Sequence, residues 1–256
     1  MPAESNNQVI ARVAALLRTV GATDVGGATT SELARATDLA RPTVHRLLNA
    51  LAAEGMVDRD LSSGRWSLGP ELYLLGAGAA LRYDITGTAG DIVERLARET
   101  GESAFLSARR GDETVCLLGR EGSFPLRSHV LHEGVRFPLG VASAGLAILG
   151  HLPDRDIDDY FARAELESAW GPAHSESAVR ERIGRTRLDG YATNPALLVE
   201  GSWGLGAAVF DSRGLPAWAL SVTGVQTRFT DERRIAMGRL LLDSAQQLSV
   251  RLRDSR

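Results

Sequence analysis

The chain has 256 residues, 44% of them hydrophobic and 24% charged, which is the composition of a folded globular protein and excludes a disordered or fibrous chain. Its 29 basic and 32 acidic residues leave a formal net charge of -3, which argues against a protein that coats nucleic acid along its whole length. All the basic residues are arginine. Arginine suits phosphates, carboxylates and guanine edges, but its presence throughout the chain makes it evidence for none of them.

The single cysteine, Cys116, excludes intramolecular disulfides and cysteine-cluster zinc sites, and it fits a reducing compartment. No run of 18 or more apolar residues is present, so we expect no membrane partner. The first residues lack the basic patch and the apolar stretch of a signal peptide. We therefore expect a cytoplasmic protein.

Residues 1–68 begin with two predicted helices. Apolar residues at helical spacing from Val9 to Val20 predict a first helix that stops before Gly21. Thr29 and Glu32 have the spacing of a capping box, which predicts a short second helix that runs to about residue 37.

A third helix and a hairpin complete this domain. The helix opens with Pro42, where a missing N–H costs least, buries an apolar face and ends at Gly55. Two short strand-like runs, residues 56–60 and 65–68, flank a Ser-Ser-Gly tip that is typical of a hairpin. Helix, short helix, turn, helix and hairpin in this order predict a winged helix-turn-helix.

The rest of the chain predicts a linker helix over residues 69–83 and a second domain over residues 84–256. Periodicity predicts helices at residues 91–100, 143–149, 153–164, 177–188 and 230–253, and strands at residues 104–109, 114–119, 125–130, 205–210 and 218–222. Short turns such as Gly111-Asp112 join strands that are adjacent in sequence. We therefore expect an α+β domain whose mixed or antiparallel sheet is flanked by helices.

Six residues of the first domain are candidates for DNA contacts: Arg41, Thr43, Arg46 and Asn49 on the third helix, and Arg59 and Arg65 on either side of the hairpin tip. A recognition helix meets base edges with its N-terminal residues, and a wing reaches phosphate or the minor groove. Arg can bridge guanine O6 and N7, and Asn can bridge adenine N6 and N7. A solvated helix surface would explain any one of these arginines alone, but not their placement on both DNA-contacting elements. We interpret His45 as a helix-flank residue.

The charge of this domain limits how it can bind. Residues 1–68 contain seven Arg and seven acidic residues, so the domain is formally neutral. Such a domain binds DNA weakly in general and must gain affinity from base contacts and from dimeric avidity. We expect a pseudo-palindromic operator with half-sites about 34 Å, or a multiple of that, apart.

Several segments resemble the IclR family of bacterial transcription regulators. They are residues 36–48 (ATDLARPTVHRLL), the wing ending Trp66-Ser67-Leu68-Gly69, Leu74-Leu75-Gly76, Gly101-Glu102-Ser103, Pro125-Leu126-Arg127, residues 138–147, residues 187–191 and the closing helix. The resemblance covers nearly the whole chain. It implies a dimeric or tetrameric DNA-binding protein whose GAF-like C-terminal domain senses a small molecule.

The resemblance also implies an effector pocket, whose residues here are Ser143, Ala144, Asn194, Gly204, Ser221 and Thr223. Backbone N–H groups at the start of the helix over residues 143–149 would form an anion site that suits a carboxylate. Ser221 and Thr223 are two apart on a predicted strand, so their hydroxyls point to one face.

The segment over residues 194–203 departs from the family pattern. Some relatives have a carboxylate at the position of Asn194 and a thiol at that of Gly204, and this chain has neither. The segment is more apolar, and Trp203 is a candidate wall of the pocket, which favours an aromatic or aliphatic acid over a two- or three-carbon keto acid. The alternative, equally weighted, is that Leu197, Leu198 and Trp203 only pack a loop onto the sheet.

No motif supports an enzyme, and we expect no cofactor or metal. Gly76-Ala77-Gly78 follows no strand and lacks the rest of a dinucleotide loop, and Ser143 lacks the first glycine of a nucleophile elbow. His129 and His132 have no third ligand at metal-site spacing, and Cys116 lies in an apolar run. The leading hypothesis is a ligand-responsive DNA-binding regulator. The alternatives are a sensory protein that acts through protein partners and, behind it, an enzyme that acts on a small organic acid.

Overall fold

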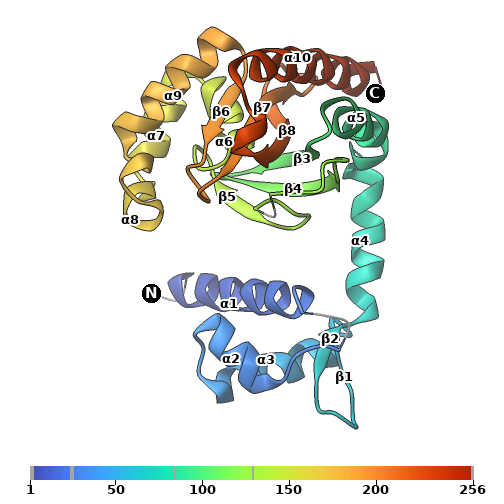
Figure 1. Ribbon diagram of the computed structural model, residues 1–256. Coiled ribbons are helices and arrows are strands. Elements are labelled where there is room, and N and C mark those ends of the chain that lie inside the picture. Colours follow the sequence, from blue (N-terminus) through green and yellow to red (C-terminus); the bar gives the residue numbers. More distant parts are fainter. Residues whose placement is uncertain (1–2, 24–25, 84, 129, 255–256) are drawn as a thin grey trace. The chain divides into compact units, whose positions relative to one another are not determined.

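The computed structural model describes residues 3–23, 26–83, 85–128 and 130–254 (Figure 1). The chain forms two compact units, Met1–Tyr83 and Asp84–Arg256, and each has its own hydrophobic core. None of the described helices is long and apolar enough to cross a membrane.

The N-terminal unit is a winged helix-turn-helix followed by a helix, as its sequence predicted. Its elements are α1 (Ala3–Gly21), α2 (Thr30–Thr37), α3 (Arg41–Ala53), β1 (Val57–Arg59), β2 (Trp66–Leu68) and α4 (Pro70–Tyr83). The two strands pair antiparallel as the wing, with Val57 opposite Leu68. Leu16, Leu33 and Leu48 from the three helices meet Trp66 of the wing in one buried core.

Local bonds attach the wing to the start of α2. The predicted capping box is present: Glu32 N donates to Thr29 Oγ1 (3.3 Å), and Thr29 N donates to Glu32 Oε2 (2.7 Å). The indole N–H of Trp66 donates to Thr30 Oγ1 (3.1 Å). The wing and the helix-turn-helix therefore share a hydrophobic core and a polar joint.

The C-terminal unit is an α+β domain with one antiparallel sheet. Its elements are α5 (Ile85–Thr100), β3 (Ser103–Arg110), β4 (Glu113–Arg120), β5 (Arg136–Pro138), α6 (Ser143–Gly150), α7 (Asp154–Phe161), α8 (Leu166–Trp170), η1 (Pro172–His174), α9 (Glu176–Asp189), β6 (Ala192–Pro195), β7 (Ser202–Phe210), β8 (Pro216–Val225), η2 (Gln226–Arg228) and α10 (Asp231–Asp254). The strand order is β5-β4-β3-β8-β7-β6, and every neighbouring pair is antiparallel.

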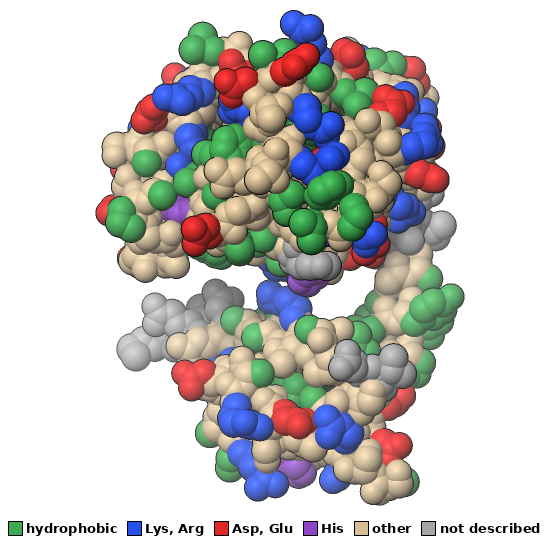
Figure 2. Space-filling view, viewed as in Figure 1, with side chains coloured by type: hydrophobic (Ala, Val, Ile, Leu, Met, Phe, Trp, Pro, Cys, Tyr) green, Lys and Arg blue, Asp and Glu red, His purple; other side chains and the backbone are tan. Residues whose placement is uncertain are grey.

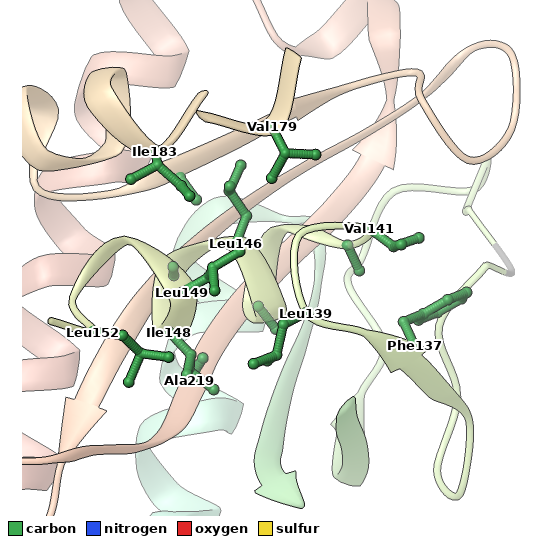
Figure 3. Close-up of a cluster of buried hydrophobic side chains, with 14 of the residues drawn as sticks. Phe137, Leu139, Val141, Leu146, Ile148, Leu149, Leu152, Val179, Ile183 and Ala219 are labelled. Carbon is green, nitrogen blue, oxygen red and sulfur yellow. The ribbon is translucent and has the colours of Figure 1, made fainter. Parts of the chain in front are cut away.

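Helices cover both faces of this sheet. On one face α6 packs against the central strands, and its apolar residues join others from α9 in one buried cluster (Figure 3). On the other face α5 and α10 cover β3, β7 and β8 (Figure 1). All eight residues of α6 are buried, so both its sides and its N-terminus lie inside the domain.

A buried ion pair fixes the junction between β3 and α10. Glu102 is only 2% exposed, and its Oε1 accepts from Arg228 Nε (2.5 Å) and Arg233 Nη2 (3.1 Å). A Cβ on Gly224 would lie 2.2 Å from Glu102 Oε2, so this glycine makes room for the carboxylate.

The strand predicted over residues 125–130 was wrong. The described residues of that segment form bends and irregular backbone, and the strand that pairs with β4 is β5, at Arg136–Pro138. Pro125 has no N–H to donate to a sheet, which disfavours a strand there. Sequence reasoning also missed β6, a four-residue edge strand that ends in Pro195 and lies in the stretch predicted as a loop.

Candidate functional site

The exposed side of α3 is the candidate DNA-contacting surface. Val44, Leu48 and Leu51 are buried against the N-terminal core, whereas Arg41 and Arg46 are exposed. Asn49 is exposed on the same side as these two arginines, whereas Thr43 is half-buried and lies at the edge of the exposed surface. Basic side chains are exposed on this unit in the space-filling view (Figure 2).

His45 belongs to the same exposed side of α3. Its side chain is exposed, and Asn49 Nδ2 donates to its Nδ1 at 3.1 Å, one helical turn away. We interpreted His45 as a helix-flank residue, and its hydrogen bond to Asn49 makes it part of the same polar surface. The i, i+4 spacing of the two residues was the signal that could have indicated it. Arg41, His45, Arg46 and Asn49 are called the recognition face below.

The two predicted wing arginines differ in their surroundings. Arg59 is exposed, and its guanidinium carbon lies 5.5 Å from the ring centroid of Trp66. Arg65 is bound within the unit: its guanidinium donates to the carbonyls of Gly26 and Gly27 and to Glu32 Oε2, at 2.9–3.1 Å. Arg65 therefore joins the wing to the start of α2, whereas Arg59 is available to a partner.

Two carboxylates keep their negative charge beside the wing. The backbone N–H of Thr29, the Thr29 side chain and the Arg65 guanidinium hold the pKa of Glu32 below its usual value. Hydrogen bonds from Ser62 and Ser63 lower the pKa of Asp60, at the base of the wing tip, to about 2. The recognition face has no carboxylate.

The C-terminal unit has a cavity at the N-terminus of α6, called the α6 cavity below. All seven predicted effector residues border it: Ser143, Ala144, Asn194, Trp203, Gly204, Ser221 and Thr223. Val130, Leu131, Ala142, Leu198 and Ser202 complete the lining. The cavity has a volume of about 20 Å³, which is room for about one water molecule.

Unpartnered donors face this cavity. The first backbone bond of α6 runs from Leu146 N to Ala142 O, so among the described residues the amides of Ser143 and Ala144, which border the cavity, have no helical acceptor. Ser221 Oγ and Thr223 Oγ1 are buried and lack any hydrogen-bond partner. Such groups are costly to bury unless something accepts their hydrogen bonds, and the helix N-terminus favours an anion.

Glycines on β7 place the α6 N-terminus against the sheet. A Cβ on Gly206 would lie 2.6 Å from Ser143 O and 3.0 Å from Ala144 N, and one on Gly204 would lie 3.0 Å from Ser143 Oγ. Gly204 pairs with Thr223 across the sheet, and Gly206 with Ser221, so all four face α6. The close approach of helix and strand is what encloses the α6 cavity.

Asn194 borders the cavity, but its amide is already bonded. Its Nδ2 donates to Val141 O (2.6 Å), and its Oδ1 accepts from Leu197 N (3.2 Å). The side chain thus connects β6 to the loop before α6 and orders the turn that follows β6. Its contribution to the cavity is to position the wall.

The indole of Trp203 lies on the opposite face of the sheet from α6. Side chains alternate along β7, so Ser202 and Gly204 face α6 whereas Trp203 joins the cluster under α10. Its ring lies 6.2 Å from that of Phe229, and the Arg234 guanidinium carbon lies 5.3 Å from its centroid. Trp203 borders the α6 cavity, but an indole wall across that cavity is not in place.

The remaining wall of the α6 cavity is apolar. Val130 and Leu198 pack against the same buried cluster as α6, and Leu131 belongs to that cluster. Sequence reasoning did not select Val130, Leu131 or Ser202, because apolar and small residues have no distinctive pattern that indicates a binding site. Ser202 Oγ lies 2.5 Å from Ser128 Oγ, which closes the cavity on that side.

The described residues contain no group of three or more His, Cys, Asp or Glu side chains that could hold a metal ion. Burial raises the pKa of the Cys116 thiol to about 12, so it stays protonated and unreactive at neutral pH. Of the two histidines considered as ligands, His132 is exposed and His129 lies outside the described residues.

Comparison with known proteins identifies the family. Residues 9–61 match the IclR helix-turn-helix domain, and residues 77–250 match the C-terminal domain of bacterial transcriptional regulators of the IclR type. The chain belongs to the IclR family. The resemblance drawn from the sequence is thereby confirmed.

Curated relatives of this IclR chain are regulators. It is 30% identical over 224 residues to the HTH-type transcriptional regulator BhcR of Paracoccus denitrificans, an alignment that covers 87% of this chain and 80% of that protein. It is 30% identical over 225 residues to the HTH-type transcriptional regulator KipR of Bacillus subtilis, covering 88% and 89%. The chain is therefore a DNA-binding transcription regulator and not an enzyme.

Solved structures have the same fold. The IclR transcriptional regulator of Alicyclobacillus acidocaldarius matches with a TM-score of 0.77 and 24% identity, over 95% of this chain and 98% of that one. An IclR homolog from Microbacterium hydrocarbonoxydans, complexed with 4-hydroxybenzoate, matches with a TM-score of 0.76 and 20% identity, over 96% and 99%.

Proposed function

We propose that this IclR-family regulator binds a pseudo-palindromic operator as a homodimer or tetramer, and that its DNA binding responds to a small organic acid held in the α6 cavity. The response to an organic acid is supported by one observation, the set of unpartnered donors around the α6 cavity. The α6 amides, Ser221 Oγ and Thr223 Oγ1 are donors that a carboxylate oxygen would accept.

The recognition face supports direct base contacts. Arg41, at the N-terminal end of α3, and Arg46, one turn further, are both exposed, and no ion pair involves either of them among the described residues. An unpaired guanidinium needs no rearrangement before it meets guanine O6 and N7, and a phosphate is the nearer partner of a residue at the helix start. We assign Arg46 and Asn49 to bases, Arg41 and Arg59 to phosphates, and Thr43 to a thymine methyl group or a phosphate.

Substitution of Arg46 tests this assignment. The DNA probe is a duplex selected by the wild-type protein from a random pool. Arg46→Ala should weaken binding by about 1–3 kcal/mol without changing the melting temperature. Arg12→Ala, which removes an exposed arginine from α1, is the matched control and should bind like wild type. Equal affinity of wild type and Arg46→Ala would overturn the placement of the recognition face.

Exposed apolar residues on α4 support a dimer. Tyr73, Leu74 and Leu75 are 78%, 60% and 53% exposed in the single chain, and Ile10 on α1 is 68% exposed. Contiguous exposed apolar residues on helices are typical of an oligomer interface. Sedimentation of Leu74→Glu should show a smaller assembly than wild type, and its operator affinity should fall with the loss of avidity. An unchanged assembly would remove α4 from the proposed interface.

The chemistry of the α6 cavity supports a carboxylic acid with an apolar body. The donors gather on the side of α6 and β8, while Val130, Leu131 and Leu198 form the other side. A volume of about 20 Å³ is too small for an aromatic acid, so binding requires Val130, Leu131 and Leu198 to move outwards. The structural relative crystallised with 4-hydroxybenzoate supports an acid of that class.

A thermal-shift panel tests the effector class. Benzoate, 4-hydroxybenzoate, medium-chain aliphatic acids and pyruvate are compared at equal ionic strength. Aromatic or aliphatic acids should raise the melting temperature. Thr223→Val, which keeps the shape of the side chain but removes its hydroxyl, should raise the Kd of these acids about tenfold. Stabilisation by pyruvate alone would contradict the apolar-body proposal, and no response to any acid would contradict acid sensing.

A further inference from the structure

A second cavity lies between α9, β6 and α10, and we call it the arginine cavity. Its volume is about 280 Å³, and three arginines line it, Arg182, Arg185 and Arg234. Trp203 lies on its wall, and Asp189 is the one carboxylate among its lining residues. Its three arginines outnumber Asp189 among the lining residues, although Arg185 and Arg234 each pair with a carboxylate that does not line the cavity, Glu181 and Asp231.

Arg182 is the unusual member of this group. Its Nη1 donates to Ala173 O (2.7 Å), but its Nε and Nη2 are buried and have no hydrogen-bond partner. Arg185 and Arg234 have carboxylate partners in Glu181 and Asp231, whereas no ion pair of Arg182 occurs among the described residues. Burial lowers the pKa of Arg182, which is the expected effect of removing a guanidinium from water.

Two further donors beside Arg182 lack acceptors. Trp203 Nε1 and Arg234 Nε are also buried without a hydrogen-bond partner. Guanidinium and indole nitrogens can only donate, so no rearrangement among these groups could satisfy them. Leaving a buried charge and several N–H groups unpaired destabilises a fold, unless a group with several acceptor oxygens binds there.

We propose that the arginine cavity binds a compact oxyanion, either a free phosphate or the carboxylate of a small metabolite. Arg182 supplies two parallel N–H donors from its guanidinium, and Trp203 supplies a third from the wall. Oxyanions match the planar fork of arginine in a bidentate arrangement. The site is separate from the α6 cavity, because the two lie on opposite faces of the β6–β7 pair, where Asn194 pairs with Gly204 and Pro195 pairs with Trp203.

The test is the concentration dependence of the melting temperature of the full chain in sodium phosphate and in sodium acetate, each compared with sodium chloride at equal ionic strength. At about ten times Kd, a specific anion should raise the melting temperature by about 3–6 °C. Phosphate as the better ligand indicates a phosphate site, and acetate as the better ligand indicates a carboxylate site. Equal effects of all three salts would overturn the proposal.

Matched variants locate the effect. Arg182→Gln should raise the Kd of the anion about tenfold or more, whereas Arg98→Gln, which removes an exposed arginine from α5, should leave it unchanged. Should Arg182→Gln not fold, Trp203→Phe keeps the ring and removes one donor, and should raise Kd about threefold or more. If every folded variant bound the anion with the Kd of wild type, the assignment of the anion to the arginine cavity would be wrong.

Thr223→Val distinguishes this site from the α6 cavity. It should keep the full response to the simple anion, because Thr223 does not line the arginine cavity. Arg182→Gln should in turn keep the response to the organic acids of the α6 cavity. Loss of the phosphate or acetate response in Thr223→Val would show that the anion binds at α6, which would overturn this proposal and leave the effector proposal standing.

Discussion

The recognition face and the α6 cavity both contain polar groups without partners, but in opposite surroundings. Arg41 and Arg46 are exposed, so water solvates them and the fold loses nothing by leaving them unpaired. Ser221 Oγ and Thr223 Oγ1 are buried, so each lacks both water and a protein partner. Unpaired polar groups are therefore ordinary at a surface. Inside a domain the same groups either lower the stability of the fold or indicate a site where a ligand binds.

Because their surroundings differ, the recognition face and the α6 cavity should respond differently to substitution. Residues of the recognition face should alter DNA binding without altering stability. Residues of the α6 cavity should alter both, because they are part of the packed interior. The following substitutions test this separation.

The largest effect is expected where α6 meets β7. Gly206→Ala puts a Cβ 2.6 Å from Ser143 O and 2.7 Å from Ser143 C, and because these are backbone atoms the helix must shift. The free energy of unfolding should fall by about 1–3 kcal/mol, as in other overpacked cores, and the response to organic acids should be lost. Urea denaturation measures the first and the thermal-shift panel the second.

Gly184→Ala is the control for this prediction. Gly184 is exposed on α9, and a Cβ there would have nothing within 4 Å. The substitution should raise the free energy of unfolding by about 0.5–1 kcal/mol, because alanine has the higher helix propensity. A Gly206→Ala protein as stable as Gly184→Ala would contradict the close packing of α6 on the sheet.

The next largest difference is expected between Arg65, which is bonded within the N-terminal unit, and Arg41, which is exposed. Arg65→Ala removes the bonds to Gly26, Gly27 and Glu32, so the free energy of unfolding of this unit should fall by about 1–2 kcal/mol. Arg41→Ala should leave stability unchanged and reduce the slope of log K against log salt by about 1, as expected for one lost phosphate contact. The reverse pattern would show that Arg65 contacts DNA and Arg41 supports the fold.

A pair of buried serines measures what the unpartnered hydroxyls do to stability. Ser249 Oγ accepts from Phe210 N (3.0 Å) and donates to Ala245 O (2.7 Å), whereas Ser221 Oγ has no partner. Ser249→Ala should lower the free energy of unfolding by about 1 kcal/mol, whereas Ser221→Ala should leave it unchanged or raise it slightly. Equal losses in denaturant melts would mean that Ser221 has a partner in solution.

The sequence alone predicted the helices, their caps and the order of elements well, because those depend on local patterns. The capping box at Thr29 and Glu32 is an example: its residues satisfy each other within one turn. The convergence of Ser143 with Ser221 came only from family resemblance, since no local pattern indicates that positions so far apart in sequence share a cavity.

Two site predictions depended on details that the sequence does not determine locally. The orientation of Trp203 follows from where β7 begins: a strand that starts at Ser202, not at residue 205 as predicted, puts Trp203 on the same face as Leu205. The role of Arg65 depends on carbonyls about 38 residues away in the chain. Tertiary contacts of this kind set the surroundings of Arg65 and Trp203, and their roles toward DNA and an effector stay predictions.

The smallest effect is expected from pH, through the buried His174. Its side chain is fully buried, its Nδ1 donates to Trp170 O (3.0 Å), and burial, with some help from the Arg182 charge, lowers its pKa from 6.5. The unfolded chain therefore binds a proton more readily than the folded one, so stability is complete above about pH 6.5 and falls as the pH drops below that value. Among the described residues, Arg182 is the charged group that acts on this ring, and it stays charged throughout the range.

His174→Asn should remove this part of the pH dependence, because the asparagine amide can still donate to Trp170 O but does not titrate. Melting temperatures between pH 7.5 and 5.5 should fall less in His174→Asn than in wild type. His132→Asn, at an exposed position, is the control and should follow wild type. An identical fall in all three proteins would mean that His174 titrates with the same pKa in the folded and the unfolded chain, contrary to its burial.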